Sequence, residues 1–139
     1  MSFTLSWYPK GTALRFEGRV DLAEINEANA ALWRDPRFDD HCFSLWDLRK
    51  GDLSCIEMDQ AKVLAAQDMA ASLHAPRIRM VFLIADTYTR EFTQEYIDYS
   101  LRMRTSWDFV IFQTEAEALA WLGLDSLGEP YAGLDKPCP

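Results

Sequence analysis

Five polar side chains stand where two buried strands, predicted over residues 42–48 and 79–85, come to an end. Carboxylates, a guanidinium and hydroxyls can bind a small ligand, pair with one another or satisfy the N–H groups of a turn. For each of them, a structural role as an ion pair or a cap is the alternative to binding. The candidate binding loop consists of Asp47, Arg49, Asp52, Thr87 and Thr89.

Ser54 is a second candidate, because Glu57 follows it in the Ser-x-x-Glu spacing of a helix N-terminal capping box. The spacing predicts a long helix from Ser54 to about His74. A phosphate on a serine there would be favoured by exposed N–H groups and by the helix dipole, and would add about −1.5 to −2 charges at neutral pH. The alternative is a plain N-cap, which stabilises a helix by about 1 kcal/mol.

Other chemistries lack the residues that they need. His41 and His74 lie in different segments without a partner at ligand spacing, so no metal site is expected. Neither is spaced to activate a nucleophile, and no glycine-rich phosphate loop is present. The sequence therefore predicts a protein that is not an enzyme and holds no cofactor or metal.

Turn and capping signals divide the chain into alternating elements. Two strands at 3–8 and 13–20, joined by a Pro-Lys-Gly turn, form a hairpin, and a helix capped by Asp21 then extends to Asp35-Pro36. Further strands at 42–48, 79–85 and 107–112 alternate with helices that begin near residues 54, 87 and 114. This β-β-α-β-α-β-α-β-α order predicts an α/β fold, with a mainly parallel five-stranded sheet, four helices and the first strand antiparallel at an edge.

Two helices carry apolar side chains at helical spacing. The predicted core-facing residues of the helix after Ser54 are Ala61, Leu64, Ala65, Met69 and Leu73. On the next helix the aromatic residues are Tyr88, Phe92, Tyr96 and Tyr99. These aromatic side chains are expected in the core, and the alternative is that some of them line an apolar groove or a homodimer contact.

Length and periodicity predict one α/β domain over residues 1–123. Residues 124–139 are rich in Gly, Pro and Asp and have no periodicity, so we expect an extended tail that lies on the surface through Tyr131.

The formal net charge of −8 makes binding to nucleic acid or to anionic membrane surfaces unfavourable. No apolar run is long enough for membrane insertion. Three widely spaced cysteines without a leader-like start predict free thiols and a cytoplasmic location.

Two stretches of the sequence resemble the STAS-like domains, which include the anti-sigma-factor antagonists. They are Phe43-Ser44-Leu45-Trp46-Asp47-Leu48-Arg49, and the segment 112–122 with its Ala-Leu-Ala-Trp-Leu ending. The similarity is greater to the stand-alone, uncharacterised bacterial branch, and the matching topology covers residues 3–123. The resemblance implies a STAS-like fold and a regulatory domain that docks onto an unknown protein partner.

In the antagonist branch a partner kinase phosphorylates a serine that follows the central strand, and the matching position here is Ser54. The sequence departs from the family pattern, since Leu53 and Ile56 replace its Asp and Gly. The alternative function is a carrier that holds a small apolar or anionic ligand. A phosphoacceptor receiver domain is excluded, because Asp21 lacks a second acidic residue and no lysine follows the last strand before Lys136.

Overall fold

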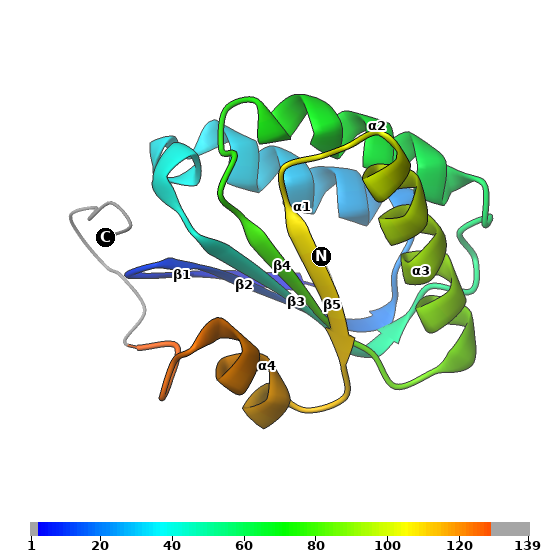
Figure 1. The fold of residues 1–139 in the computed structure, drawn as a ribbon. Helices are drawn as coiled ribbons and strands as arrows, with labels where there is room; N and C mark the ends of the chain where they lie inside the picture. Colours follow the sequence, from blue (N-terminus) through cyan, green and yellow to red (C-terminus); the bar gives the residue numbers. More distant parts are fainter. Residues whose placement is uncertain (1–2, 129–139) are drawn as a thin grey trace.

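The strands of the computed structural model, which describes residues 3–128, form one sheet in the order β1-β2-β3-β4-β5 (Figure 1). The strands are β1 (Phe3–Tyr8), β2 (Gly11–Arg19), β3 (Phe43–Asp52), β4 (Arg79–Leu83) and β5 (Asp108–Phe112). The helices are α1 (Leu22–Arg34), the 3-10 helix η1 (Pro36–Asp40), α2 (Gln60–Ser72), α3 (Thr87–Arg102) and α4 (Glu115–Leu122).

Only the first pair of strands is antiparallel. β1 lies at one edge and pairs antiparallel with β2, whereas β2 to β5 are parallel neighbours. The predicted fold class, with its five strands, four α-helices and antiparallel edge strand, is therefore confirmed. The 3-10 helix η1 is an addition that the sequence did not reveal, and Asp35 caps it by accepting a hydrogen bond from the N–H of Arg37.

The two faces of the sheet carry separate apolar clusters, because successive side chains of a strand point to opposite sides. The larger cluster lies under α1, α2 and α3, with Leu14, Trp46 and Phe82 on its sheet side. The smaller cluster, around Leu45 and Val81, lies under α4. Figure 1 shows α1, α2 and α3 on one side of the sheet and α4 on the other.

The predicted helix starts near residues 21, 87 and 114 are confirmed, the first and the last together with their capping residues. Asp21 caps α1 by accepting a hydrogen bond from the N–H of Glu24, at 2.9 Å. Thr114 and Glu117 form a complete capping box at α4, and Gly123 ends that helix in the left-handed conformation, at φ 73°. Short polar side chains before an apolar repeat therefore located both helices.

The predicted end of the central strand is wrong, because β3 continues to Asp52. Its last residues pair with the end of β2, with Lys50 opposite Glu17 and Asp52 opposite Arg19. This pairing satisfies backbone groups that a loop would have exposed, so the sequence 49–52 is strand although its composition is typical of a turn. Asp47 consequently lies in the middle of β3.

The predicted capping box at Ser54 is also wrong. Ser54 is exposed in a turn, and its N–H donates to Oδ1 of Asp52 at 3.0 Å, while the N–H of Ile56 bonds to the carbonyl of Leu53 at 2.9 Å. Leu53 and Ile56 are buried and anchor this turn. Helix α2 begins only at Gln60, after Asp59, whose side chain makes no capping hydrogen bond.

Helix α2 is also rotated relative to the predicted core-facing stripe. Ala61, Leu64 and Ala65 are buried as expected, but Asp68 and Ala71 complete the buried face. The predicted core residue Leu73 is 77% exposed. On α3, Phe92 and Tyr96 are buried as predicted.

Residues 124–128 have no regular secondary structure, and Leu127 packs onto the cluster under α4. The rest of the predicted tail, with Tyr131, lies outside the described residues. Cys55 is exposed and its thiol is free, as expected. None of the helices within residues 3–128 is long and apolar enough to span a bilayer.

Candidate functional site

Asp47 and Arg49, both predicted as site residues, are brought together in a charged cluster on the face that α4 covers. The carboxylate of Asp47 accepts hydrogen bonds from Nε and Nη2 of Arg49, both at 2.9 Å, and from Nη1 of Arg15 at 2.8 Å. Arg15 also contacts Oε1 of Glu115, the first residue of α4, at 2.8 Å. The cluster contains two cations and two anions, so its charges compensate one another.

Electrostatics stabilise the ionised forms in this cluster. Burial opposes the charge of Asp47, but the hydrogen bonds and charges of Arg49 and Arg15 outweigh it and lower the pKa of the carboxyl. Hydrogen bonding to Asp47 raises the pKa of Arg49. Because every charge is already paired, the cluster's clear role is to join β2, β3 and the start of α4.

The other predicted loop residues lie elsewhere. Asp52 holds the Ser54 turn, and its hydrogen bonds from Ser54 lower the pKa of its carboxyl. Thr87 is exposed at the start of α3, whereas Thr89 is fully buried and its hydroxyl has no hydrogen-bond partner among the described residues. The cap of α3 is Asp86, whose side chain accepts from the N–H of Thr89, so neither threonine caps the helix. The five residues do not form one loop.

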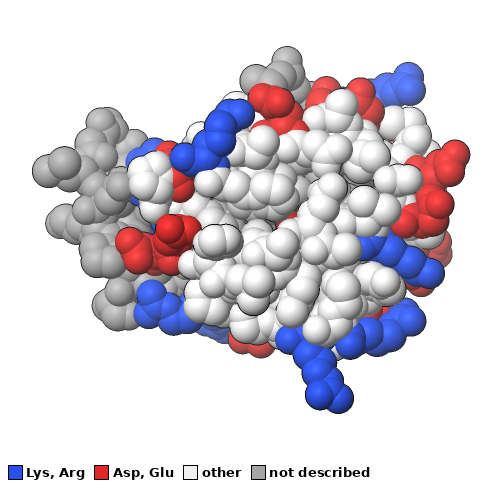
Figure 2. All heavy atoms as spheres, turned by 90° about the horizontal axis from the view of Figure 1, so that it is seen from above, with Lys and Arg blue, Asp and Glu red and all other residues white. Residues whose placement is uncertain are grey.

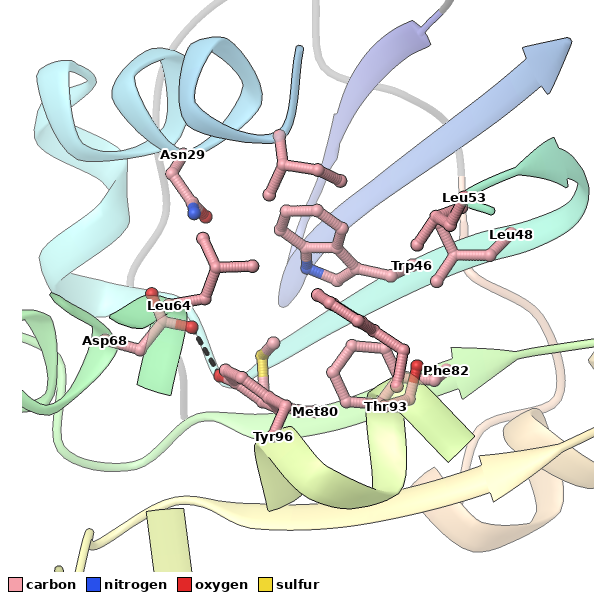
Figure 3. Close-up of a pocket in the computed structure, with 12 residues that line it drawn as sticks. Asn29, Trp46, Leu48, Leu53, Leu64, Asp68, Met80, Phe82, Thr93 and Tyr96 are labelled. Carbon is pink, nitrogen blue, oxygen red and sulfur yellow. Dashed lines mark hydrogen bonds between the residues drawn. The ribbon is translucent and has the colours of Figure 1, made fainter. Parts of the chain in front are cut away.

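A cavity of about 50 Å³ lies between the sheet and helices α1, α2 and α3 (Figure 3). Its walls are mostly apolar, with Trp46 and Leu48 from β3 and Met80 and Phe82 from β4. Four polar side chains reach it from the three helices and define its chemistry. They are Asn29, Asp68, Thr93 and Tyr96.

Asp68 and Tyr96 form a buried pair across the cavity. The hydroxyl of Tyr96 donates to Oδ2 of Asp68, which Figure 3 shows as a dashed line. Burial raises the pKa of Asp68 to about 7, although the hydrogen bond from Tyr96 opposes that rise. Burial, together with the charge of Asp68, raises the pKa of Tyr96 well above its usual value.

Asn29 and Thr93 are the unpartnered members of this group. The two residues are 5% and 3% exposed, and neither side chain makes a hydrogen bond to another of the described residues. Their polar atoms are not among the fully enclosed atoms without a partner, so they are open to the cavity and can bond to a guest. Their position in the cavity wall suits a polar guest.

The sequence analysis missed these cavity residues, although one signal was present. Asp68 is four residues after Leu64 and three after Ala65, which puts it on the same helix face as these two core residues. A carboxylate at a core-facing position indicates either a paired or a functional group. Asn29 and Thr93 carried no comparable signal, because the approach of α1 to α3 depends on the tertiary fold.

The outward side of α2 forms a second candidate surface. Four apolar residues along it are exposed; Val63 is 47% and Leu73 77% exposed, and the α2 stripe consists of Val63, Ala66, Ala70 and Leu73. Figure 2 shows the helical side of the molecule, on which a broad area without charged side chains lies inside a rim of acidic and basic residues.

Comparison with known proteins identifies the fold. Neither the protein-family models nor the curated protein sequences give a match to this chain. The solved structures that are similar to it include the following two. An uncharacterised DUF3478-family protein with a SpoIIAA-like fold, from Shewanella loihica PV-4, has 15% identity and a TM-score of 0.50 over 86% of this chain and 91% of that one. The unphosphorylated anti-sigma-factor antagonist SpoIIAA has 14% identity and a TM-score of 0.52 over 87% of this chain and 97% of that one.

The chain has a SpoIIAA-like α/β fold, so the fold that the sequence resemblance implied is confirmed. Its similarity extends to both an anti-sigma-factor antagonist and an uncharacterised protein. At 14–15% identity, the similarity is one of fold. Function has to be argued from the sites of this chain.

Proposed function

We propose that this protein is a regulatory protein-interaction domain without enzymatic activity, in keeping with a fold that it shares with an anti-sigma-factor antagonist. The observation that carries the proposal is the α2 stripe. Exposed apolar side chains that lie together on an otherwise polar surface are typical of a protein contact. Ser54 and the buried cavity add two features through which such a domain could be regulated.

The first partner that fits the α2 stripe is a second copy of the chain. Val63, Ala66, Ala70 and Leu73 are spaced by 3, 4 and 3 residues, which is the repeat of a coiled-coil seam. Asp59 lies in the turn just before α2 and Arg77 in the turn after it, and both are exposed. Two α2 helices packed antiparallel about a two-fold axis at the level of residue 68 would bring the turn of Asp59 in each copy towards the turn of Arg77 in the other.

The same axis makes the apolar residues complementary. Val63 of one copy would face Leu73 of the other, and Ala66 would face Ala70. The two alanines are small enough for the helices to approach closely. A homodimer interface needs this self-complementarity, because one patch must serve both sides.

Charge reversal tests this pairing. We expect Asp59→Arg and Arg77→Asp each to weaken the dimer about tenfold, since each puts like charges together twice at ~0.7 kcal/mol a contact. An equimolar mixture of the two variants should form a heterodimer with both contacts restored. Analytical ultracentrifugation of each variant and of the mixture measures this.

Two further variants complete that test. Leu73→Asp should give a monomer, because it would bury an unpaired charge, and Glu91→Arg, an exposed change on α3, should leave the dimer unchanged. A monomeric wild type, or a mixture that behaves like its separate components, would contradict the homodimer. In that case we would propose that the α2 stripe binds a different protein.

We also propose Ser54 as a phosphorylation site that controls the turn before α2. Its backbone N–H holds the carboxylate of Asp52, so a phosphate would bring two negative groups together and open the turn. Hydrogen exchange at the N–H of Ile56 should be faster in Ser54→Glu than in Ser54→Ala. Equal exchange in the two variants would argue against a switch, as would the absence of phosphate on Ser54 in protein isolated from its native cell and measured by mass spectrometry.

A second candidate function is the binding of a small ligand in the cavity. The unpartnered side chains of Asn29 and Thr93 favour it, because a guest with hydrogen-bonding groups would satisfy them. In this alternative the protein is a carrier or sensor. Titration with small probes of different charge, followed at the amides that line the cavity, tests it.

A further inference from the structure

We propose that the cavity binds a small organic cation, with an ammonium or amidinium group placed against Asp68 and a short apolar part against Trp46 and Phe82. This inference deepens the second candidate function and rests on it. It also differs from the apolar or anionic ligand expected from the sequence. The charge, the size and the surroundings of the cavity each contribute to the argument.

The ionisable groups around the cavity exclude an anion. Asp68 and Tyr96 are the titratable side chains in its wall, and no Lys or Arg of the described residues lines it. A smaller hollow that shares Asp68 with the cavity is also lined by His41, whose pKa burial lowers to about 4. At neutral pH that imidazole is uncharged, so the charge that the described wall can offer is the carboxylate of Asp68.

Hydrogen-bonding capacity in the cavity matches a cationic nitrogen. Oδ2 of Asp68 receives the bond from Tyr96, and Oδ1 remains able to accept another. The amide oxygen of Asn29 and the hydroxyl of Thr93 provide two more acceptors. Figure 3 shows Asn29 and Asp68 on facing helices, α1 and α2, at the same side of the cavity. A guest that donates two or three hydrogen bonds would satisfy these groups together.

The size of the cavity limits the guest. One water needs about 10–15 Å³ of such space, so 50 Å³ holds about three or four water-sized groups. A propylammonium or acetamidinium ion, with four non-hydrogen atoms, is therefore the right scale. Larger guests would have to separate the helices.

Two hollows lined by residues of α1 and α2 adjoin the cavity on the side of Asn29 and Asp68, and we place the entry of the guest there. The smaller hollow next to the cavity is lined by Trp33 and Phe38. The same two side chains line an open surface hollow of about 460 Å³, together with Asp39 and His74. Trp33 is 39% exposed and stands where the surface hollow meets the interior.

The experiment compares three probes of similar size and different charge: n-propylamine, 1-propanol and propionate. Each is titrated at pH 8, where Asp68 is ionised, and binding is followed by calorimetry and by NMR shifts of the Thr93 and Tyr96 amides. We expect saturable binding of propylamine, at least tenfold weaker binding of propanol and none of propionate. In Asp68→Asn the preference of propylamine over propanol should disappear.

Two variants serve as controls. Asp39→Asn removes the carboxylate of the surface hollow and should leave propylamine binding unchanged; loss of binding in this variant instead would overturn the assignment to the cavity. Asn29→Leu fills the cavity and removes an unpartnered amide, so it should abolish binding and raise the melting temperature. It keeps the proposal testable if Asp68→Asn does not fold.

The outcomes separate this inference from the function on which it rests. If propanol binds in the cavity as strongly as propylamine, or propionate binds there, the cavity is a ligand site and cation selectivity is wrong. If none of the probes shifts the cavity amides, the second candidate function fails together with this inference.

Discussion

Asp68 shows how one buried residue links the stability of this fold to pH. Its carboxyl is fully enclosed, its hydrogen-bond partner Tyr96 is neutral, and burial raises its pKa from 3.8 to about 7. The folded protein therefore holds a proton that the unfolded chain releases at lower pH. As pH rises from about 4 to about 7, this group lowers the free energy of unfolding, and above that range the penalty is constant.

We therefore predict that Asp68→Asn becomes more stable relative to the wild type as pH rises from 5 to 7, by at most about 1.4 kcal/mol per pH unit. Urea unfolding of both proteins at pH 5, 6, 7 and 8 measures the difference. The comparison cancels the contribution of His41, which acts in the opposite direction because its pKa is lowered to about 4. A difference that does not change with pH would show that Asp68 is not buried in a neutral form.

The sequence predicted which residues belong to the charged cluster better than it predicted which residues contact one another. It singled out Asp47 and Arg49, but Arg15, which donates to Asp47, is 32 residues from it along the chain, and Glu115, which accepts from Arg15, is 100 residues from Arg15. Such pairs depend on which strands and helices become neighbours. Pairing of Asp47 with Arg49 is one of the alternatives that the sequence offers for two neighbouring charges; in the structure both residues belong to β3 and point to the same face of the strand.

At the scale of elements, two similar capping patterns have different outcomes. Thr114-x-x-Glu117 begins α4, whereas Ser54-x-x-Glu57 lies in a turn. The difference comes from the neighbours of Ser54: Asp52 binds its N–H, and the buried residues Leu53 and Ile56 fix the turn. A local pattern therefore predicts a helix start only where no competing turn is anchored in the core.

A matched pair of substitutions tests this difference. Thr114→Ala should lower the free energy of unfolding by about 1 kcal/mol, because it removes the side chain that caps α4. Ser54→Ala should change it by less than about 0.5 kcal/mol, since an exposed serine outside a cap contributes little. Chemical unfolding of both variants measures the two values. Equal losses would mean that Ser54 acts as a cap in solution.

At the scale of the whole molecule, the alternation of strands and helices predicted the sheet, its mainly parallel order and the antiparallel edge. The helical periods are strong for α1 and α3 and weak for α2, whose outer side is itself apolar, and α4 is recognised by its capping box. That two-sided character explains why Leu73 was assigned to the core. A helix that is apolar on both sides gives no periodic signal for the side that faces the sheet.

The net charge of −8 still predicts weak binding to nucleic acid. The cytoplasmic location stays a prediction.

Gly11 joins the hairpin to the parallel part of the sheet at a very short backbone distance. A Cβ atom at this position would lie 2.2 Å from the carbonyl oxygen of Phe43. Any other amino acid would force the first turn away from β3, so a single absent methyl group permits an antiparallel edge strand to attach to this parallel sheet. Substitution of Gly11 is therefore incompatible with the observed pairing of β2 with β3.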